Sequence, residues 1–272
     1  MTAPTPARVR DALISAGCRV QLEAGWDDPR IGKYGSGWQP TGVVLHHTAN
    51  SGTLGDAPSL GWVLHNQYDP VRACHLLISR SGVVHLVYAL GCYHAGMGGP
   101  MTVGGTSIPQ DMGNAYLYGI EIESKGTNAS MTAAESTADG ITPAQVDATT
   151  RAAAALVQLL GKNETAVIRH RDWAPGRKND VLQPLSTWRD LIRARLQGST
   201  PTPTPTPTPE SKGDGTMFVA EVKYGTNNTS WWLVGPNGTV SLRTADAATW
   251  NGPRLRVSDE SEWRLILARY PQ

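Results

Sequence analysis

The sequence has no run of about 18 apolar residues, the length that a membrane-spanning helix needs, so we expect no membrane insertion. It also has no excess of one charge, because 24 basic and 23 acidic side chains leave a net charge of +1. Without a surplus of Lys and Arg, or a basic stripe, nucleic acid is not an expected partner. With hydrophobic residues at 40% and charged residues at 17%, the chain can form a globular core.

Cysteine is scarce. The three cysteines, Cys18, Cys74 and Cys92, form no C-x-x-C pair. An odd number without metal-ligand spacing argues against a disulfide framework and suits a reducing compartment. The first residues, Met1 to Pro6, lack the charged start and apolar stretch of a secretory signal. We therefore expect a chain made and held in the cytoplasm, with its thiols acting as small buried side chains.

Proline and threonine alternate from Pro201 to Pro209. Proline fixes φ and lacks a backbone donor, so this tract cannot join a sheet and should extend as polyproline II. At about 3.1 Å per residue it would hold its flanking parts roughly 30 Å apart. The sequence therefore predicts a first domain at 1–198, a linker at 199–210 and a second domain at 211–272.

Before this linker, strand and helix signals alternate. Thr142-Pro143 supplies an N-cap and a first-turn proline for an alanine-rich helix that should run to Leu160. Helices are also expected at 6–16, 58–68 and 185–196, and strands at 43–47, 75–79, 83–87, 120–123 and 167–169. This order predicts an α/β domain in which a mixed central β-sheet is flanked by helices.

Residues 211–272 have a different pattern. Alternating apolar residues at 217–224, 231–234 and 239–243 predict a small, mostly β module, with a turn at 235–238. The module holds four of the nine tryptophans, namely Trp231, Trp232, Trp250 and Trp263. Exposed indole faces would suit stacking on sugar rings, whereas in so small a module the rings could equally form the core.

Three segments carry the residue types of a catalytic site. A predicted strand ends in His46-His47, a second presents Glu121, and the loop from His170 to Asp180 brings an imidazole, a cation and a carboxylate together. Two imidazoles and one carboxylate are a ligand set of catalytic zinc, which keeps a fourth position for water. Neighbouring strand residues point to opposite faces, so only one histidine of the pair can face a shared site. Spacing alone does not decide whether these distant segments meet.

Together, Leu45-His46-His47-Thr48-Ala49, Gly119-Ile120-Glu121-Ile122-Glu123 and the loop from His170 to Asp180 resemble the zinc-dependent N-acetylmuramoyl-L-alanine amidases of the type-2 family, which are related to peptidoglycan recognition proteins. The resemblance covers about residues 36–196 and is specific, because three separated motifs occur in the right order. It implies hydrolysis of the amide that joins N-acetylmuramic acid to L-alanine in bacterial peptidoglycan.

The resemblance also implies roles for individual residues. A zinc ion would be held by His46, His170 and Asp180, with Glu121 as the catalytic carboxylate and Lys178 as the catalytic lysine. No role follows for His47 or His75. Residues expected near the cleft, as possible substrate contacts, are Trp38, Asn50, Trp62 and His94.

Several alternatives stay open. Asp172 could replace Asp180 as a ligand, and Val181 follows Asp180 where the family usually has proline. Glu121 and Glu123 could be solvated carboxylates, or the acid and nucleophile of a glycosidase. A peptidoglycan-binding receptor without catalysis is another possibility, although the full set of implied ligands together with Glu121 and Lys178 fits a hydrolase better.

These features combine into one expectation for the whole chain. An amidase without a secretory signal, joined by a spacer to a cell-wall-binding module at 211–272, resembles a bacteriophage endolysin with antimicrobial, bacteriolytic action. Such a protein would act as a monomer and stay in the host bacterial cytoplasm until lysis, when it reaches the cell wall. A tether raises the local concentration of the catalytic domain at an insoluble substrate.

Overall fold

The computed structural model describes residues 4–34, 38–67 and 70–198, together with the backbone of four strands nearer the C-terminus. The chain divides into two compact units, Met1–Pro203 and Thr204–Gln272. The predicted linker at 199–210 lies outside the described residues.

A six-stranded mixed sheet in the order β1-β4-β3-β7-β2-β8 forms the centre of the first unit. Its strands are β1 (Arg19–Leu22), β2 (Gly42–His47), β3 (Leu76–Ile78), β4 (Val83–Leu86), β7 (Leu117–Ile122) and β8 (Val167–Arg169). Strands β3, β7, β2 and β8 are parallel, whereas β4 is antiparallel to β3. The carboxyl ends of these parallel strands therefore meet at one edge, the usual place for a ligand in such a sheet.

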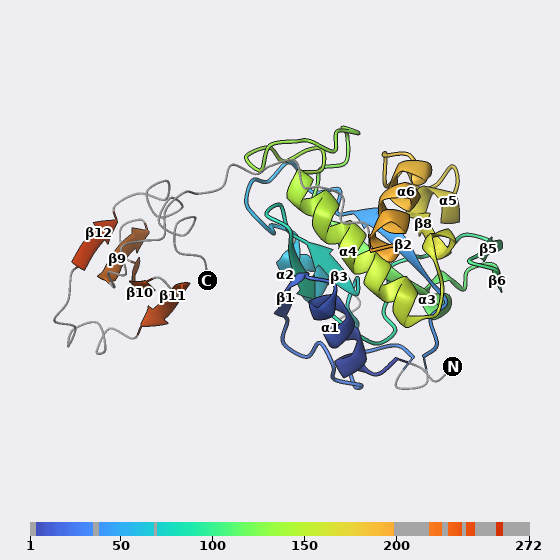
Figure 1. Ribbon diagram of the computed structural model, residues 1–272, viewed down its shortest axis with the longest axis horizontal. Helices are drawn as coiled ribbons and strands as arrows, with labels where there is room; N and C mark the ends of the chain where they lie inside the picture. The colour runs from blue at the N-terminus through green and yellow to red at the C-terminus, as the bar shows by residue number, and fades with distance from the viewer. Residues whose placement is uncertain are drawn as a thin grey trace. The chain divides into compact units, whose positions relative to one another are not determined.

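One face of the sheet is covered by three helices, α1 (Pro6–Ser15), α4 (Pro143–Leu159) and α6 (Leu185–Leu196). Figure 1 shows α4 running across the sheet, with α1 and α6 packed beside it. The buried side of α4 is rich in small residues, among them Ala148, Ala152 and Ala155. This packing of helices on a mixed sheet confirms the predicted α/β fold.

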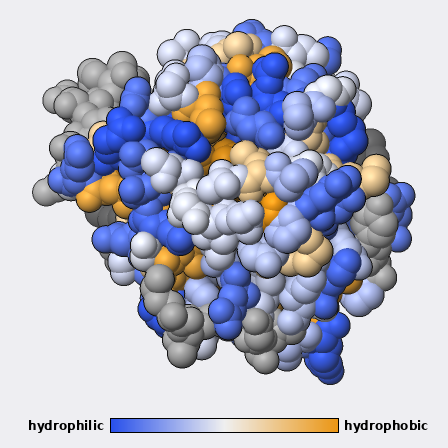
Figure 2. All heavy atoms as spheres, turned by 90° about the vertical axis from the view of Figure 1, so that its right-hand side faces the viewer, coloured by the Kyte–Doolittle hydropathy of each residue, from blue (hydrophilic) through white to orange (hydrophobic). Residues whose placement is uncertain are grey.

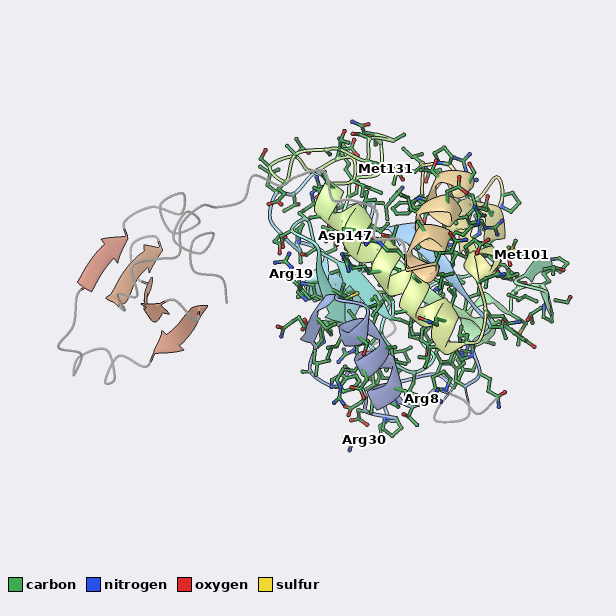
Figure 3. All side chains as sticks on the ribbon, viewed as in Figure 1. Arg8, Arg19, Arg30, Met101, Met131 and Asp147 are labelled. Carbon is green, nitrogen blue, oxygen red and sulfur yellow. The ribbon has the colours of Figure 1, made fainter. Side chains whose placement is uncertain are left out.

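Helix α4 begins at the residue that the sequence predicts. Thr142 accepts a hydrogen bond from the Gln145 backbone at 3.0 Å, and the Gln145 side chain accepts one from the Thr142 backbone at 3.0 Å. This capping box satisfies two backbone donors that a helix start leaves free. Asp147 of α4, labelled in Figure 3, is half-buried. It accepts hydrogen bonds from Arg151 and from Arg195 of α6, which ties the two helices together.

Shorter elements complete the first unit. They are α2 (Leu60–Leu64), the hairpin of β5 (Met101–Val103) and β6 (Thr106–Ile108), α3 (Gly113–Tyr116), a 3₁₀ turn (Glu164–Ala166) and α5 (His170–Trp173). The expected helix at 58–68 is wrong in extent, because α2 has only five residues. The Ser59 backbone and hydroxyl both donate to the Glu123 carboxylate, at 3.0 and 2.8 Å, and this contact fixes the chain just before the helix.

The second unit contains a four-stranded sheet in the order β11-β10-β9-β12. Its strands are β9 (Phe218–Tyr224), β10 (Asn228–Gly235), β11 (Gly238–Leu242) and β12 (Arg254–Val257). Strand β10 is antiparallel to both β9 and β11, so the predicted hairpin across 235–238 is present. These four strands are the described part of the second unit.

The surface of the first unit is mixed in polarity. Figure 2 views the side that carries β5, β6, α5 and α6, where apolar residues occur singly or in small groups among hydrophilic ones. Within the described part of the chain, no helix combines the length and the apolar character needed to cross a bilayer. The three cysteines are free thiols, and Cys74 and Cys92 are buried.

Candidate functional site

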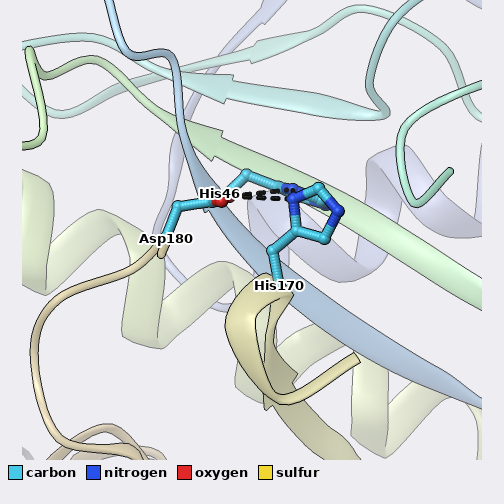
Figure 4. Close-up of side chains that lie close together, drawn as sticks. All are labelled: His46, His170 and Asp180. Carbon is cyan, nitrogen blue, oxygen red and sulfur yellow. Dashed lines mark hydrogen bonds and ion pairs between the residues drawn. The ribbon is translucent and has the colours of Figure 1, made fainter. Parts of the chain in front are cut away.

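Two histidines and one aspartate meet at the carboxyl edge of the parallel strands. His46 lies near the end of β2, His170 begins α5 directly after β8, and Asp180 lies on the following loop (Figure 4). The His46 and His170 Nδ1 atoms are 2.9 Å apart, and Asp180 Oδ2 lies 3.3 Å from the first and 3.0 Å from the second. Among the described residues, this trio is the group whose side chains could hold a metal ion, and all three are buried.

Local backbone structure brings Asp180 back to His170. Gly176 adopts a φ of +78°, which glycine accepts without steric cost, and the chain reverses there. The Arg171 backbone then donates to the Asp180 carbonyl at 2.6 Å and closes the loop. This is the reversal that Pro175-Gly176 predicts. The Asp180–Val181 peptide bond that follows is cis.

Hydrogen bonds fix which nitrogen of each imidazole carries the proton. His170 Nε2 lies 2.9 Å from the Ala95 carbonyl, which can only accept, so Nε2 is the protonated atom. His94 Nε2 likewise donates to the Leu117 carbonyl at 2.9 Å, which leaves His94 Nδ1 as an acceptor. His46 Nε2 lies 3.2 Å from that acceptor and therefore donates to it. Both Nδ1 atoms that face Asp180 thus carry lone pairs.

The centre of the trio consequently gathers three electron-pair donors. Burial, followed by the nearby His170, lowers the pKa of His46 to about 4, so this ring is neutral at pH 7. Three lone pairs in van der Waals contact repel one another unless a cation lies among them. A tetrahedral zinc with bonds of about 2.0–2.1 Å separates its ligands by about 3.3 Å, close to the spacing here, so the donor set fits zinc.

Glu121 lies beside this trio. In the register of β2 and β7 it is the direct partner of His46, so both side chains project from the same face of the sheet. Its Oε2 atom is buried and has no hydrogen-bond partner among the described residues. Burial first, and the charges of Asp180 and Glu123 next, raise the pKa of the Glu121 carboxyl well above its usual range. The positive charge of the exposed Lys178 opposes this rise.

Glu123 has very different surroundings. Its Oε1 atom accepts hydrogen bonds from Thr48 at 2.9 Å, Asn50 at 2.7 Å and the Ser59 hydroxyl at 2.8 Å, while Oε2 accepts from the Ser59 backbone at 3.0 Å. This carboxylate is fully buried and used for packing. The glycosidase interpretation needs a second available carboxylate, and Glu123 does not provide one.

Asp172, the rival for Asp180, is held elsewhere. It accepts hydrogen bonds from the Arg169 guanidinium at 2.9 and 2.7 Å and from the Arg169 backbone at 3.0 Å. These contacts cap α5 and use both carboxylate oxygens. Asp172 is therefore not part of the trio.

The four residues expected near the cleft occupy different environments. Trp38 is only 5% exposed and stacks on His75, so its position favours packing over substrate contact. Asn50 uses its amide on Glu123 and on the Gly52 backbone. Trp62 is 60% exposed and free to touch a ligand, whereas His94 is a direct neighbour of His46.

His47 and His75 lie outside the trio. The His47 ring packs against Gly126, where an added Cβ would lie 2.1 Å from the ring, and both its nitrogens lack hydrogen-bond partners among the described residues. His75 is fully buried and accepts a hydrogen bond from the Gly119 backbone at 2.8 Å. Burial lowers the pKa of His75 to about 3, so it is a neutral packing residue.

A buried carboxylate next to converging metal-ligand side chains is the arrangement of a metal-assisted hydrolase. The sequence model of the N-acetylmuramoyl-L-alanine amidase family matches residues 36–183, which is more than half of the chain, so the chain belongs to this family. It is accordingly a peptidoglycan hydrolase that cleaves the amide bond between N-acetylmuramic acid and L-alanine.

Solved structures with similarity to this chain include three that can be compared directly. AmpD has 21% identity over 66% of this chain and 94% of its own, with a TM-score of 0.43. AmiD from E. coli, in complex with anhydro-N-acetylmuramic acid-L-Ala-D-gamma-Glu-L-Lys, has 22% identity over 56% of this chain and 57% of its own, with a TM-score of 0.41. PlyL has 14% identity over 67% of this chain and 99% of its own, with a TM-score of 0.42. No curated protein matches the chain in sequence.

The groups around the trio that sequence analysis missed are mainly backbone atoms. The carbonyls of Ala95 and Leu117 set the protonation of the imidazoles, yet a backbone carbonyl leaves no mark on the residue type. Asn114, whose side chain holds the Ala95 segment, also lies outside the recognised motifs.

Proposed function

We propose that this amidase is zinc-dependent and that His46, His170 and Asp180 hold the ion. The observation that carries the proposal is the convergence of two imidazole lone pairs and one carboxylate oxygen, at 2.9 to 3.3 Å from one another, with both Nε2 protons donated elsewhere. When bound, zinc supplies a Lewis acid that polarises a carbonyl and lowers the pKa of water to about 7.

Glu121 acts as the general base in this proposal. It takes a proton from the attacking water and passes it to the leaving amine of L-alanine. Two observations support the role: Glu121 is the strand partner of His46, and its Oε2 atom is buried without a partner among the described residues. A raised pKa suits a group that must hold a proton during the reaction, because an ordinary glutamate would release it too readily.

Lys178 stabilises the negative charge that develops on the amide oxygen. Its ammonium group is exposed, and its charge lowers the pKa values of both Glu121 and His46, which supports a position between the site and the solvent. A cation fixed at that point would favour the tetrahedral intermediate over the flat amide. Trp62, with 60% of its surface exposed, is the candidate among the four predicted contacts that can still touch glycan or peptide.

The whole chain is best explained as a bacteriophage endolysin. The Pro-Thr tract at 201–209 would act as a spacer, and residues 211–272 would bind the cell wall. The four-stranded sheet of the second unit supports a folded module beyond the tract. On this proposal the protein stays in the host cytoplasm until lysis and works as a monomer, and the tether keeps the amidase at its insoluble substrate.

Bond identification tests the catalytic part of the proposal. Purified cell walls treated with the protein should gain new L-alanine amino termini. A chelator should remove this activity, and added Zn²⁺ should restore it. Release of reducing sugars would instead identify a glycosidase, and release of nothing would identify a receptor. Activity that survives complete chelation would overturn zinc dependence while leaving the cleaved bond established.

Deletion of residues 199–272 tests the tether. The shortened chain should sediment less with intact walls while turning over small soluble muropeptides at the full-length rate. A chain that lacks only residues 211–272 but keeps the linker serves as the matched control and should lose the same wall binding. Unchanged wall binding after either deletion would reject a targeting role for the second unit.

A further inference from the structure

The segment His94-Ala95 contacts both imidazoles of the trio at their Nε2 atoms, on the side of each ring that faces away from Asp180. The His94 ring accepts the proton of His46 Nε2 at 3.2 Å, and the next carbonyl, of Ala95, accepts the proton of His170 Nε2 at 2.9 Å. Two adjacent residues therefore determine the orientation of two rings, one from strand β2 and one from helix α5. Ala95 is buried, and its carbonyl also accepts a hydrogen bond from Arg177 at 3.3 Å.

The two nitrogens of His94 have separate functions. Nε2 donates to the Leu117 carbonyl at the start of β7, and this bond leaves Nδ1 as a lone-pair acceptor. Only with Nδ1 as an acceptor can His46 donate from Nε2 and turn its own Nδ1 toward Asp180. The His94 ring also meets the rings of His46 and His75 edge to face, which restricts its rotation.

Asn114 holds this segment in place. Its side-chain oxygen accepts hydrogen bonds from the backbones of both His94 and Ala95, each at 2.8 Å. Asn114 is itself anchored, because its carbonyl accepts a hydrogen bond from the indole of the buried Trp38 at 3.2 Å. One carboxamide oxygen thus fixes the two consecutive residues on which the two imidazoles depend.

We propose that His94 and Asn114 are positioning residues, which hold His46 and His170 in the orientation that turns both Nδ1 atoms toward the metal. This inference rests on the proposed zinc site. It assigns His94 to the support of His46 rather than to the substrate contact expected from the sequence. Neighbours that orient a metal-binding histidine typically affect metal affinity by about 10- to 100-fold.

Two substitutions of His94 separate its functions. In His94→Asn the side-chain oxygen can take the place of Nδ1 and still accept from His46, whereas in His94→Gln the amide reaches the place of Nε2 and keeps only the bond to Leu117. We expect the zinc dissociation constant of His94→Gln to rise by about 10- to 100-fold and that of His94→Asn to stay within a few-fold of wild type. Competition with a chromogenic zinc chelator on the full-length protein measures both.

Asn114 provides an independent pair of variants. Asn114→Ala removes the acceptor and should weaken zinc binding about tenfold, whereas Asn114→Asp keeps an acceptor for both backbone donors and should restore it. Asn163→Ala is the matched control: Asn163 also accepts two hydrogen bonds with one oxygen, from the Thr165 backbone and hydroxyl, but both residues are exposed. It should leave the zinc affinity unchanged.

The possible outcomes distinguish a failure of the positioning role from a failure of the proposed zinc site. If the wild-type chain binds no zinc, the proposed zinc site fails. If the wild type binds zinc but His94→Gln binds it equally tightly, or if His94→Asn loses as much affinity as His94→Gln, the positioning role is overturned and zinc binding stands. Should a His94 variant not fold, the difference between Asn114→Ala and Asn114→Asp decides, and equal affinities in those two variants would reject the role.

Discussion

Glu121 and Glu123 lie two residues apart at the end of β7, and their surroundings are opposite. Glu123 receives four hydrogen bonds, from Thr48, Asn50 and Ser59. Glu121 has a buried Oε2 atom without a partner in the described part of the chain. Two carboxylates that look equivalent in the sequence thus differ in the hydrogen-bond donors that surround them in the fold.

This difference shows how a catalytic carboxylate can be recognised in a structure. A buried carboxylate with a full set of donors has low energy as an anion and no reason to exchange a proton. A buried carboxylate without donors is costly to keep, and folding retains such a group mainly where chemistry needs it. By this criterion Glu121 is a candidate catalytic residue beside the trio, whereas Glu123 has a structural role and holds the loop around Ser59.

Replacing Glu121 should have the largest effect on catalysis. We expect Glu121→Gln to lower kcat on purified cell walls by about 10²–10³, because the base is lost while the shape is kept. The free energy of unfolding should not fall, since Oε2 of the Glu121 carboxyl is buried and has no hydrogen-bond partner among the described residues. Steady-state kinetics and chemical denaturation give the two values. A variant that keeps full activity would reject Glu121 as the base.

Replacing Lys178 should have the second-largest effect on catalysis. Lys178→Met should reduce kcat by about 10² through the loss of charge stabilisation in the transition state, with no change in zinc content. Lys125→Met, another exposed lysine on the loop that follows β7, is the matched control and should stay near wild type. Comparable losses in the two variants would point to general electrostatics rather than to a defined position.

Glu123 should behave in the opposite way. We expect Glu123→Gln to lower the free energy of unfolding by about 1–3 kcal/mol, because buried donors then face an amide group that cannot accept from all of them. Thr48→Val in the same background should cost less than it does in wild type, since the two side chains share one hydrogen bond. Denaturant titration of the four proteins tests this. A stability equal to wild type would remove the contrast with Glu121.

The smallest expected effect is the contribution of His75 to the pH dependence of the free energy of unfolding. In the fold the pKa of His75 is about 3, while its ordinary value is 6.5, so below pH 6.5 the unfolded chain binds a proton that the folded chain does not. The stabilising contribution of neutral His75 is complete above pH 6.5 and is lost as pH falls toward 3. Between pH 6 and pH 5 this costs roughly 1 kcal/mol per pH unit.

His75→Asn isolates that contribution, because the asparagine oxygen can still accept from the Gly119 backbone. Urea titrations of metal-free protein at pH 5, 6 and 7 should give a shallower pH dependence for the variant by roughly 1 kcal/mol per pH unit. Identical slopes for the two proteins would mean that His75 does not stay neutral in the fold.

Local sequence rules predict some elements closely. Helix α6 spans Leu185–Leu196, and α4 begins after Thr142, as the apolar periodicity and the capping residues indicate. Helix α2 begins only after Ser59, whose backbone and hydroxyl donate hydrogen bonds to Glu123, a residue 64 positions away. A long-range contact of that kind leaves no local signal, and so the boundary could not be predicted.

The sequence likewise predicts some features of the candidate site but not others. Strand alternation indicates that only one of His46 and His47 can face a shared site, and the family pattern selects His46, His170 and Asp180. The hydrogen bonds from His94, Ala95 and Leu117 that orient the imidazoles depend on the packing of the segment around 94 behind the trio. Sequence spacing carries no information about that packing.

Metal content tests the central claim most directly. Full-length protein that is stripped with a chelator, reloaded with Zn²⁺ and desalted should retain about one zinc ion per chain, as expected for a site with three protein ligands. His170→Ala, which removes one of those ligands, should retain almost none, while His85→Ala, at a histidine outside the site, should match wild type. Zinc absent from the wild type, or full occupancy in His170→Ala, would contradict the account.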